Sequence, residues 1–369
     1  MKFQTTDPWD PIHSLERHGK HRLTSVEFTV SQLCNMRCEH CAVGDSLVHR
    51  EGLRIPAEQL FRRLDEIEHL QTISITGGEP AYDRHSVEHY IVPLLRYAKE
   101  RGLRTQINTN LTLDYGRYEL LAPYIDVFHI SFNYRGPEDF RRIGFAKAEK
   151  DVGRPTAERL YERMIGNAAR LSGEGAFVSA ETMINYRTHR HVTDLHLAVK
   201  AMGCRRHEIH PMYPSAFAAN LPVLPLDELR CAIERLLDAR DPDIWMLFGT
   251  LPFFACSPDA SHRSLLARLR REPNVTVRND PDGRNRLNVN TFTGEVFVTD
   301  FSDVPSFGNV LTDRLEDVFD RWSDHELQRK VNCHCPAAEC CGPNLLVADM
   351  YYKEVDFTNR KAIMGNQRC

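Results

Sequence analysis

Three cysteines stand close together near the start of the chain, in the run Cys34-Asn-Met-Arg-Cys38-Glu-His-Cys41. They directly follow a strand-like run, Val26-Glu-Phe-Thr-Val30. Three thiolates at this spacing can hold a four-iron, four-sulfur cluster by three of its irons, because such clusters take thiolate ligands. The fourth iron then has an open position for a small molecule, and open positions are typical of catalytic metal sites. The triplet therefore predicts a catalytic cluster.

The same cysteines are open to a second interpretation, a structural zinc site with His40 or His49 as the fourth ligand. Structural zinc sites usually pair two close thiols with a second, distant pair. A tight triplet followed by a barrel-like chain departs from that pattern, so the cluster is the favoured interpretation.

A glycine-rich turn, Thr76-Gly77-Gly78-Glu79-Pro80, follows the second strand-like run. The two glycines let the backbone approach a ligand closely, and the Glu79 carboxylate can accept a hydrogen bond from an ammonium group. Glycine and proline also mark many ordinary turns. The position of this turn after a strand, about 35 residues beyond the triplet, makes it a candidate ligand-binding turn.

Short strand-like runs alternate with longer amphipathic runs over most of the chain, which predicts βαβ units and a parallel sheet. The expected strands are 25–30, 72–76, 105–108, 127–132, 177–184 and 207–212. The expected helices are 56–69, 86–101, 115–122, 156–172, 191–202 and 226–239. Six such units make an α/β fold, a partial (β/α)6 TIM-like barrel, in which chemistry lies in loops at the carboxyl ends of the strands.

The predicted barrel covers residues 24–245, after an N-terminal segment 1–23. The alternation stops near residue 246, and 246–369 reads as a small C-terminal extension with a β-hairpin at 286–299. The charged stretch 135–154 is expected to be a long loop after the fourth strand, and a candidate lid.

One face of the expected strands is polar on five consecutive strands. Side chains two residues apart share a face, and this face collects Gln106, Asn108, His129, Ser131, Asn133, Glu181, Glu208 and His210, besides Ser74 and Thr76. We expect a barrel lumen that holds a polar cofactor and substrate. The alternative is a network of polar residues that satisfy one another.

The composition excludes some classes of protein. The 369 residues include 47 basic and 51 acidic residues, a net charge near −4, which argues against a general nucleic-acid surface. The polar first residues have no signal-peptide core, and no run approaches the roughly 18 apolar residues of a membrane span. We expect a cytoplasmic protein with no nucleic-acid or membrane partner, where clustered cysteines indicate metal binding more than disulfides.

A second cysteine group, Cys333-His-Cys335-Pro-Ala-Ala-Glu-Cys340-Cys341, lies after the hairpin. Three of its thiols, with the remote Cys256, can hold an auxiliary four-iron, four-sulfur cluster. The alternative is a zinc knuckle. Cys341 and the terminal Cys369 then remain as possible soft-metal thiols, or as part of an exposed tail.

The C-x3-C-x2-C spacing and the Gly-Gly-Glu-Pro turn resemble those of radical S-adenosylmethionine (SAM) enzymes. The resemblance implies that SAM binds the open iron and that an electron from the cluster cleaves a carbon–sulfur bond of SAM. It also implies a flavodoxin- or ferredoxin-type electron donor. The positions carried over as SAM contacts are Gly77, Gly78 and Glu79 for the amino group, Asn108 and Ser131 for the methionine or ribose, and His40 near the adenine.

Over nearly its whole length the chain resembles the YfkAB-type radical SAM proteins, in segments such as His210-Pro-Met-Tyr-Pro-Ser and Trp245-Met-Leu-Phe-Gly-Thr-Leu-Pro. The hairpin, helix and cysteine order resembles the twitch or SPASM extensions of radical SAM enzymes. It has fewer cysteines than a full SPASM domain, and Thr299-Asp300 stands where a cysteine is usual, so one auxiliary cluster is expected.

The substrate is open at this point. Glu181, Glu208 and His210 are the candidate catalytic residues of the lumen, or they form a buried ion-paired network. We expect a small-molecule substrate. The C-terminal thiols also resemble those of the radical SAM enzyme that makes arsinothricin, which implies 3-amino-3-carboxypropyl transfer from SAM to arsenite. Further alternatives are a peptide-modifying maturase and a non-enzymatic iron–sulfur or metalloid carrier.

Overall fold

The computed structural model describes residues 7–255, 257–299, 304–328 and 350–352. In this part of the chain one sheet has the strand order β11-β10-β9-β1-β2-β3-β4-β5-β6-β7-β8. The strands are β1 (Ser25–Ser31), β2 (Thr72–Gly77), β3 (Arg104–Thr109), β4 (Val127–Ser131), β5 (Val178–Ile184), β6 (Arg206–Pro211), β7 (Trp245–Gly249), β8 (Val275–Arg278), β9 (Arg286–Asn290), β10 (Glu295–Phe297) and β11 (Gly308–Asn309).

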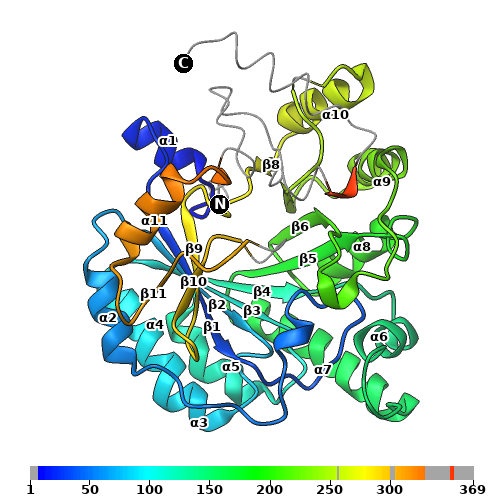
Figure 1. Ribbon diagram of the computed structural model, residues 1–369. Coiled ribbons are helices and arrows are strands. Elements are labelled where there is room, and N and C mark those ends of the chain that lie inside the picture. Colours follow the sequence, from blue (N-terminus) through cyan, green and yellow to red (C-terminus); the bar gives the residue numbers. More distant parts are fainter. Residues whose placement is uncertain (1–6, 256, 300–303, 329–349, 353–369) are drawn as a thin grey trace.

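Strands β1 to β8 pair in parallel in chain order, with helices between them. Figure 1 shows α2, α4, α5, α7 and α8 around the outside of a curved sheet. The helices are α1 (Ile12–His18), α2 (Ala57–Asp65), α3 (Arg84–Ser86), α4 (Val92–Glu100), α5 (Tyr115–Leu121), α6 (Pro137–Gly144), α7 (Arg154–Gly173), α8 (Val192–Ala201), α9 (Leu226–Ala239), α10 (Ala260–Arg271) and α11 (Leu315–Asp324). The predicted α/β partial barrel is confirmed.

The strand alternation explains the two faces of the sheet. The side chains of Ile73, Ile107 and Phe128 are fully buried in the main apolar core, together with residues of the outer helices. A second core joins Ile209 of β6 and Phe248 of β7 to α9 and α10. Apolar burial outside leaves the polar positions of the same strands for the lumen.

The sheet is longer than the six parallel strands that we expected. Trp245-Met-Leu-Phe-Gly249 forms the fully buried β7, and after α10 the short β8 pairs with it in parallel. The expected end of the βα alternation near residue 246 is therefore wrong, because a short apolar run can be a buried strand without any alternation. The predicted hairpin is present as β9 and β10, and β9 pairs in parallel with β1. The domain boundary at residue 245 stays a prediction, and the sheet continues across this position.

The stretch 135–154, expected to be a loop, contains helix α6. Pro137 occupies its first turn with Glu138 and Asp139, and Arg141 and Arg142 lie in its last turn. These charges complement the helix dipole. Its apolar side is only Phe140 and Ile143, both buried, and so short a stripe is hard to distinguish from a charged loop.

Residues of the N-terminal segment fill one part of the lumen. The Trp9 indole donates to Ser74 Oγ of β2 at 2.9 Å, and Asp7 pairs with Arg278 of β8 at 3.0 Å. Asp7 also lies 3.8 Å from Arg206 of β6. The segment thus connects strands from both sides of the open barrel.

Two buried histidines join α8 to β6. His196 Nε2 accepts from the Asp241 amide, so its other nitrogen can donate to His207 Nδ1 at 2.9 Å. His207 Nε2 then donates to Thr182 Oγ1 at 2.9 Å, and Thr182 donates to the carbonyl of Phe132. Each ring is neutral in this chain of bonds, because protonation would place two donors against each other.

This histidine pair predicts acid sensitivity. Burial lowers the pKa of His196 to about 4 from 6.5, and that of His207 well below its ordinary value. The unfolded chain therefore takes up protons first as the pH falls from 6.5 to about 4, and stability is lost in that window, by about 3 kcal/mol for His196 alone. Urea unfolding at several pH values should show this loss. A His196→Leu/His207→Leu double variant should lose less over the same window, and equal losses would contradict the account.

None of the helices in the described residues is long and apolar enough to cross a membrane.

Candidate active site

The cysteine loop, residues 34–41, leaves the carboxyl end of β1 and is held by its neighbours. The amides of Arg37 and Glu39 donate to the carbonyls of Gly144 and Ile143 at 3.0 Å, so the end of α6 supports the loop. Ser215, after β6, donates to the carbonyl of Cys41 at 3.0 Å. The three thiols come from one short loop, but segments after β4 and β6 fix its position.

The three thiols share one partly buried environment. Burial raises the pKa of Cys34 to about 12 and that of Cys38 well above its ordinary value, and the neighbouring cysteines add to both shifts. Three polar groups face the sulfur atoms. The Met36 amide and Asn110 Nδ2 donate toward Cys34 Sγ at 3.4 and 3.8 Å, and the Tyr134 hydroxyl, which can donate or accept, lies 4.0 Å from Cys38 Sγ.

These observations fit a metal cluster. Thiols that burial keeps protonated become ligands only when a metal ion displaces the proton, and the surrounding donors can stabilise the bound sulfurs. Among the described residues, no three His, Cys, Asp or Glu side chains converge on the position of a single metal ion. A four-iron cluster does not require such convergence, because each of its three ligated irons takes one thiolate. His49, a ligand in the zinc interpretation, instead lies 3.0 Å from Glu149.

The glycine turn packs directly against the segment that leads from β1 into the cysteine loop. The Gly78 amide donates to the Ser31 carbonyl, and the Glu79 amide to the Leu33 carbonyl, both at 2.7 Å. A Cβ atom on Gly77 would lie 2.1 Å from the Ser31 oxygen, and one on Gly78 2.2 Å from the Leu33 oxygen. Gly77 also has a φ of 131°. Only glycine fits at these two positions, since any Cβ would separate the turn from the loop.

The Glu79 side chain is fully buried beneath this turn. Its two oxygens accept from Thr109 Oγ1 at 2.7 and 2.9 Å, from the Asn110 amide at 2.7 Å and from the Ala81 amide at 3.2 Å. Burial raises the pKa of Glu79 to about 7, although the Asn110 and Thr109 bonds oppose the rise. The carboxylate therefore ties the end of β2 to the end of β3. The contact with SAM expected for Glu79 stays a prediction.

The other expected SAM contacts lie around the same end of the sheet. Asn108 Oδ1 accepts from Gln106 Nε2 at 3.0 Å, and Ser131 at the end of β4 is exposed. His40 lies in the cysteine loop with its Nδ1 buried and without a hydrogen bond, and burial lowers its pKa. No contact among the described residues tests these roles, which stay predictions.

The three candidate catalytic residues form one connected set with His129. Glu181 lies 2.8 Å from His129 Nε2, and Glu208 lies 2.8 Å from His210 Nε2. Glu208 also lies 3.7 Å from His129 Nδ1, which joins the two pairs. Glu208 is buried and pairs with Arg206 at 3.1 Å and with Arg278. Burial opposes ionisation, but these guanidinium groups hold the pKa of Glu208 well below its usual range.

The set therefore has two parts. Glu208 is fixed in a buried ion-paired network, which is the structural role that the sequence left open as the alternative to catalysis. Glu181 is only partly buried, and His210 reaches Thr250 Oγ1 at 3.1 Å. These two side chains are the better placed for contact with a substrate.

Sequence reasoning missed the ion pair that closes the cysteine loop. Glu39, between Cys38 and Cys41, accepts from Arg187 Nε at 2.5 Å and Nη2 at 2.7 Å, and from the Tyr186 hydroxyl at 3.2 Å. Glu39 and Arg187 are 148 residues apart in the chain. The only sequence signal was a lone acidic residue inside the triplet and a lone arginine after the fifth strand.

Replacing Arg187 with leucine should loosen the cysteine loop. Glu39 would keep its buried position but lose two charge-assisted bonds, at a cost of about 1–3 kcal/mol. We expect the reconstituted variant to lose iron to a chelator several times faster than the wild type. Arg190→Leu, in the same segment but without contact to Glu39, is the matched control. Equal rates of iron loss in both variants would contradict this role.

The second cysteine group lies outside the described residues, as do Cys256 and Cys369. The predicted ligands Cys333, Cys335 and Cys340 and the additional Cys341 are part of that group. Of the remaining cysteines, Cys204 is buried and Cys231 partly buried, and both are free thiols.

Known proteins share both the fold and the sequence of this chain. Residues 28–194 match the model of the radical SAM superfamily, and residues 212–362 match that of the YfkB-like domain. YfkA of Bacillus subtilis strain 168 is 53% identical over 360 residues, which cover 96% of each chain. The pyruvate formate-lyase-activating enzyme of Clostridium pasteurianum is 24% identical over 155 residues, 38% of this chain and 64% of that enzyme.

Solved structures show the same fold at low identity. SuiB of Streptococcus suis bound to S-adenosylmethionine has a TM-score of 0.62 and 17% identity. The match covers 92% of this chain and 77% of the SuiB chain. Native anSMEcpe with bound AdoMet has a TM-score of 0.61 and 16% identity, and the match covers 93% of this chain and 100% of that chain. The cysteine loop after β1, the partial barrel, both family models and the near full-length match to YfkA together show that the chain belongs to the radical SAM superfamily, as a YfkA-type protein with a YfkB-like domain.

Proposed function

We propose that the chain reductively cleaves SAM at a four-iron, four-sulfur cluster held by Cys34, Cys38 and Cys41 and uses the resulting radical on a small-molecule substrate. The observation that carries this proposal is the pair of backbone bonds that joins the Gly77-Gly78-Glu79 turn to Ser31 and Leu33, directly before the cysteine loop. They place the candidate SAM-binding turn against the candidate cluster ligands.

When bound, the cluster supplies the electron that breaks a carbon–sulfur bond of SAM. The residues of this protein bind SAM and the substrate and hold the cluster in position. Gly77 and Gly78 present their backbone close to the site, Asn108 and Ser131 offer polar contacts, and His40 flanks the adenine in our proposal. Tyr134 and Asn110 donate toward the sulfurs, and the Glu39–Arg187 pair closes the loop.

Within the lumen we assign the substrate contacts to Glu181 and His210. Glu181 and its partner His129 can exchange a proton across their 2.8 Å hydrogen bond. Glu208, held by Arg206 and Arg278, orients His210 through the other bond. A polar substrate of small size suits a lumen lined by these groups.

For the C-terminal extension, 246–369, we propose one auxiliary four-iron, four-sulfur cluster with Cys256, Cys333, Cys335 and Cys340 as ligands, in a twitch- or SPASM-like arrangement. A flavodoxin- or ferredoxin-type protein would supply electrons in the cytoplasm. Iron analysis of Cys335→Ala should then show a loss of about four irons, with the cluster of the N-terminal triplet retained.

Anaerobic turnover of the reduced, reconstituted protein tests the reaction. We expect SAM to be consumed and 5′-deoxyadenosine to accumulate, because a deoxyadenosyl radical that abstracts hydrogen ends as that product. Methylthioadenosine formed only with arsenite would instead support 3-amino-3-carboxypropyl transfer, in which Cys341 and Cys369 would hold the arsenite. No SAM consumption under any of these conditions would overturn the proposed function.

A further inference from the structure

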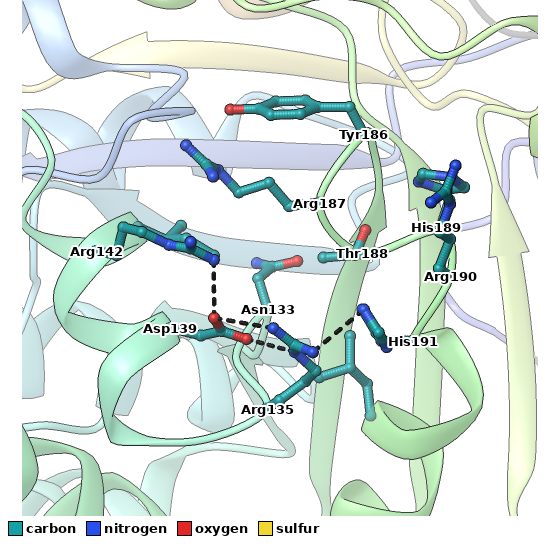
Figure 2. A pocket seen from close by; sticks show the side chains of 12 residues that line it. Asn133, Arg135, Asp139, Arg142, Tyr186, Arg187, Thr188, His189, Arg190 and His191 are labelled. Carbon is teal, nitrogen blue, oxygen red and sulfur yellow. Dashed lines mark hydrogen bonds and ion pairs between the residues drawn. The ribbon is translucent and has the colours of Figure 1, made fainter.

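A cavity of about 400 Å³ lies beside the ends of β4 and β5, between these strands and helices α6 and α8. Figure 2 shows the side chains that line it. Of the described residues around it, none belongs to the set that we assign to SAM, and none to Glu181, Glu208 and His210. The cavity is therefore distinct from the residues that we assign to SAM and to the substrate, and it needs its own explanation.

The lining carries an excess of positive charge. Arg135, Arg142, Arg187 and Arg190 face the cavity, and Asp139 is the only carboxylate among the described lining residues. Asp139 pairs with Arg135 at 2.6 Å and with Arg142 at 3.0 Å, and Arg187 pairs with Glu39. In the described part of the chain Arg190 has no carboxylate within ion-pair distance, and its Nε lies 3.2 Å from His189 Nε2.

The two histidines of the lining do not add to this excess. His189 lies 3.2 Å from Glu228, and His191 lies 3.7 Å from Asp194. His191 also lies 3.2 Å from an Arg135 nitrogen. Each histidine thus has a carboxylate of its own, and the uncompensated charge is that of the arginines.

A buried donor points to the same kind of ligand. Asn133 is 3% exposed, and its Oδ1 accepts from the Met183 amide at 2.8 Å, which fixes the orientation of the amide group. Its Nδ2 is buried without a hydrogen-bond partner. Figure 2 shows Asn133 among Arg135, Arg142, Arg187 and Thr188. A buried donor without a partner is costly, and an acceptor bound in the cavity would remove that cost.

We propose that this cavity binds the oxyanion of a small molecule, either a phosphate or a carboxylate group. Guanidinium groups recognise both through charge-assisted hydrogen bonds, and Asn133 Nδ2 would supply a neutral donor to one of the oxygens. The volume is within the range of small-ligand sites. Arg187 is shared by the cavity and by Glu39 of the cysteine loop, so the bound anion lies one side chain away from the loop.

Calorimetric titration of the full-length protein at low ionic strength tests this site, with inorganic phosphate and succinate as the two probes. We expect saturable binding of at least one probe, and the tighter one identifies the oxyanion. Asn133→Asp keeps an acceptor for the Met183 amide but replaces the free donor with a carboxylate oxygen. We expect this variant to bind the probe about 10- to 100-fold more weakly.

Arg190→Gln provides a second variant, because Arg190 is exposed and we expect its replacement to leave the fold intact. We expect it to bind the probe about 5- to 10-fold more weakly. Arg84→Gln lies on helix α3, which Figure 1 shows away from α6 and α8, and this variant should bind as the wild type does. The proposal is overturned if neither probe binds the wild type saturably, or if Arg190→Gln binds as tightly as Arg84→Gln.

Discussion

Replacing Cys38 with serine is expected to abolish SAM cleavage and to remove one cluster, about four irons, from the reconstituted protein. Cys38 Sγ is the sulfur of the triplet that lies beside the Tyr134 hydroxyl, at 4.0 Å. Serine keeps the size of the side chain but offers a poor ligand to iron. Without the Cys38 thiolate, only two of the four irons would keep a cysteine ligand. We expect activity to fall by at least three orders of magnitude, as when a nucleophile or ligand essential to a mechanism is removed.

Cys231→Ser is the matched control, because Cys231 is a partly buried free thiol on α9, remote from the loop in sequence. It should retain both its iron and its activity. If Cys38→Ser retained full iron and SAM cleavage, the assignment of the catalytic cluster to the triplet would be wrong. Iron content and activity must be measured on the same preparation, so that loss of the cluster is separated from loss of protein.

Replacing Glu79 with alanine is expected to cost about 3–6 kcal/mol of folding free energy, a large share of the total for a globular domain. Thr109 and the amides of Ala81 and Asn110 would all lose their acceptor in a buried site. The turn would then lose its connection to the end of β3, and SAM binding would fall as well. Urea unfolding and SAM titration measure the two effects.

Glu79→Gln separates the structural role from the predicted contact with SAM. Glutamine keeps one acceptor and the shape of the side chain, so we expect a loss of only about 1–3 kcal/mol. A contact with the SAM ammonium depends on the charge of Glu79. The glutamine variant should therefore lose more binding free energy for SAM than free energy of unfolding. Equal stability of the wild type and the alanine variant would contradict the role that we give to the buried carboxylate.

The parts of this protein that local sequence determines were predictable. The cysteine triplet after β1 and the glycine turn at the end of β2 are each a single short stretch of sequence. The alternation of side chains along β2 to β6 distinguished the apolar outer face, with Ile73 and Ile107, from the polar lumen. Helices α7, α8 and α9 have long amphipathic runs, so their predicted bounds agree with the structure within two residues. Local period and turn chemistry carry this information.

The parts that depend on long-range packing were not predictable. Nothing near Glu39 indicates Arg187, and nothing near Asp7 or Trp9 indicates β8 or β2 as their partners. Helix α6 and strand β8 are too short for a period to be read. The cavity beside Asn133 exists only because α6 and α8 approach the same two strand ends.

The most direct test of the account is whether SAM binds the open iron of the cluster held by Cys34, Cys38 and Cys41. Electron–nuclear double resonance of the reduced protein, with SAM labelled by ¹⁵N in its amino group and ¹⁷O in its carboxylate, measures this contact. We predict hyperfine coupling from both labels in the wild type and none in Cys38→Ser. A reduced cluster with full iron content and no coupling from either label would contradict the account and favour an iron–sulfur carrier.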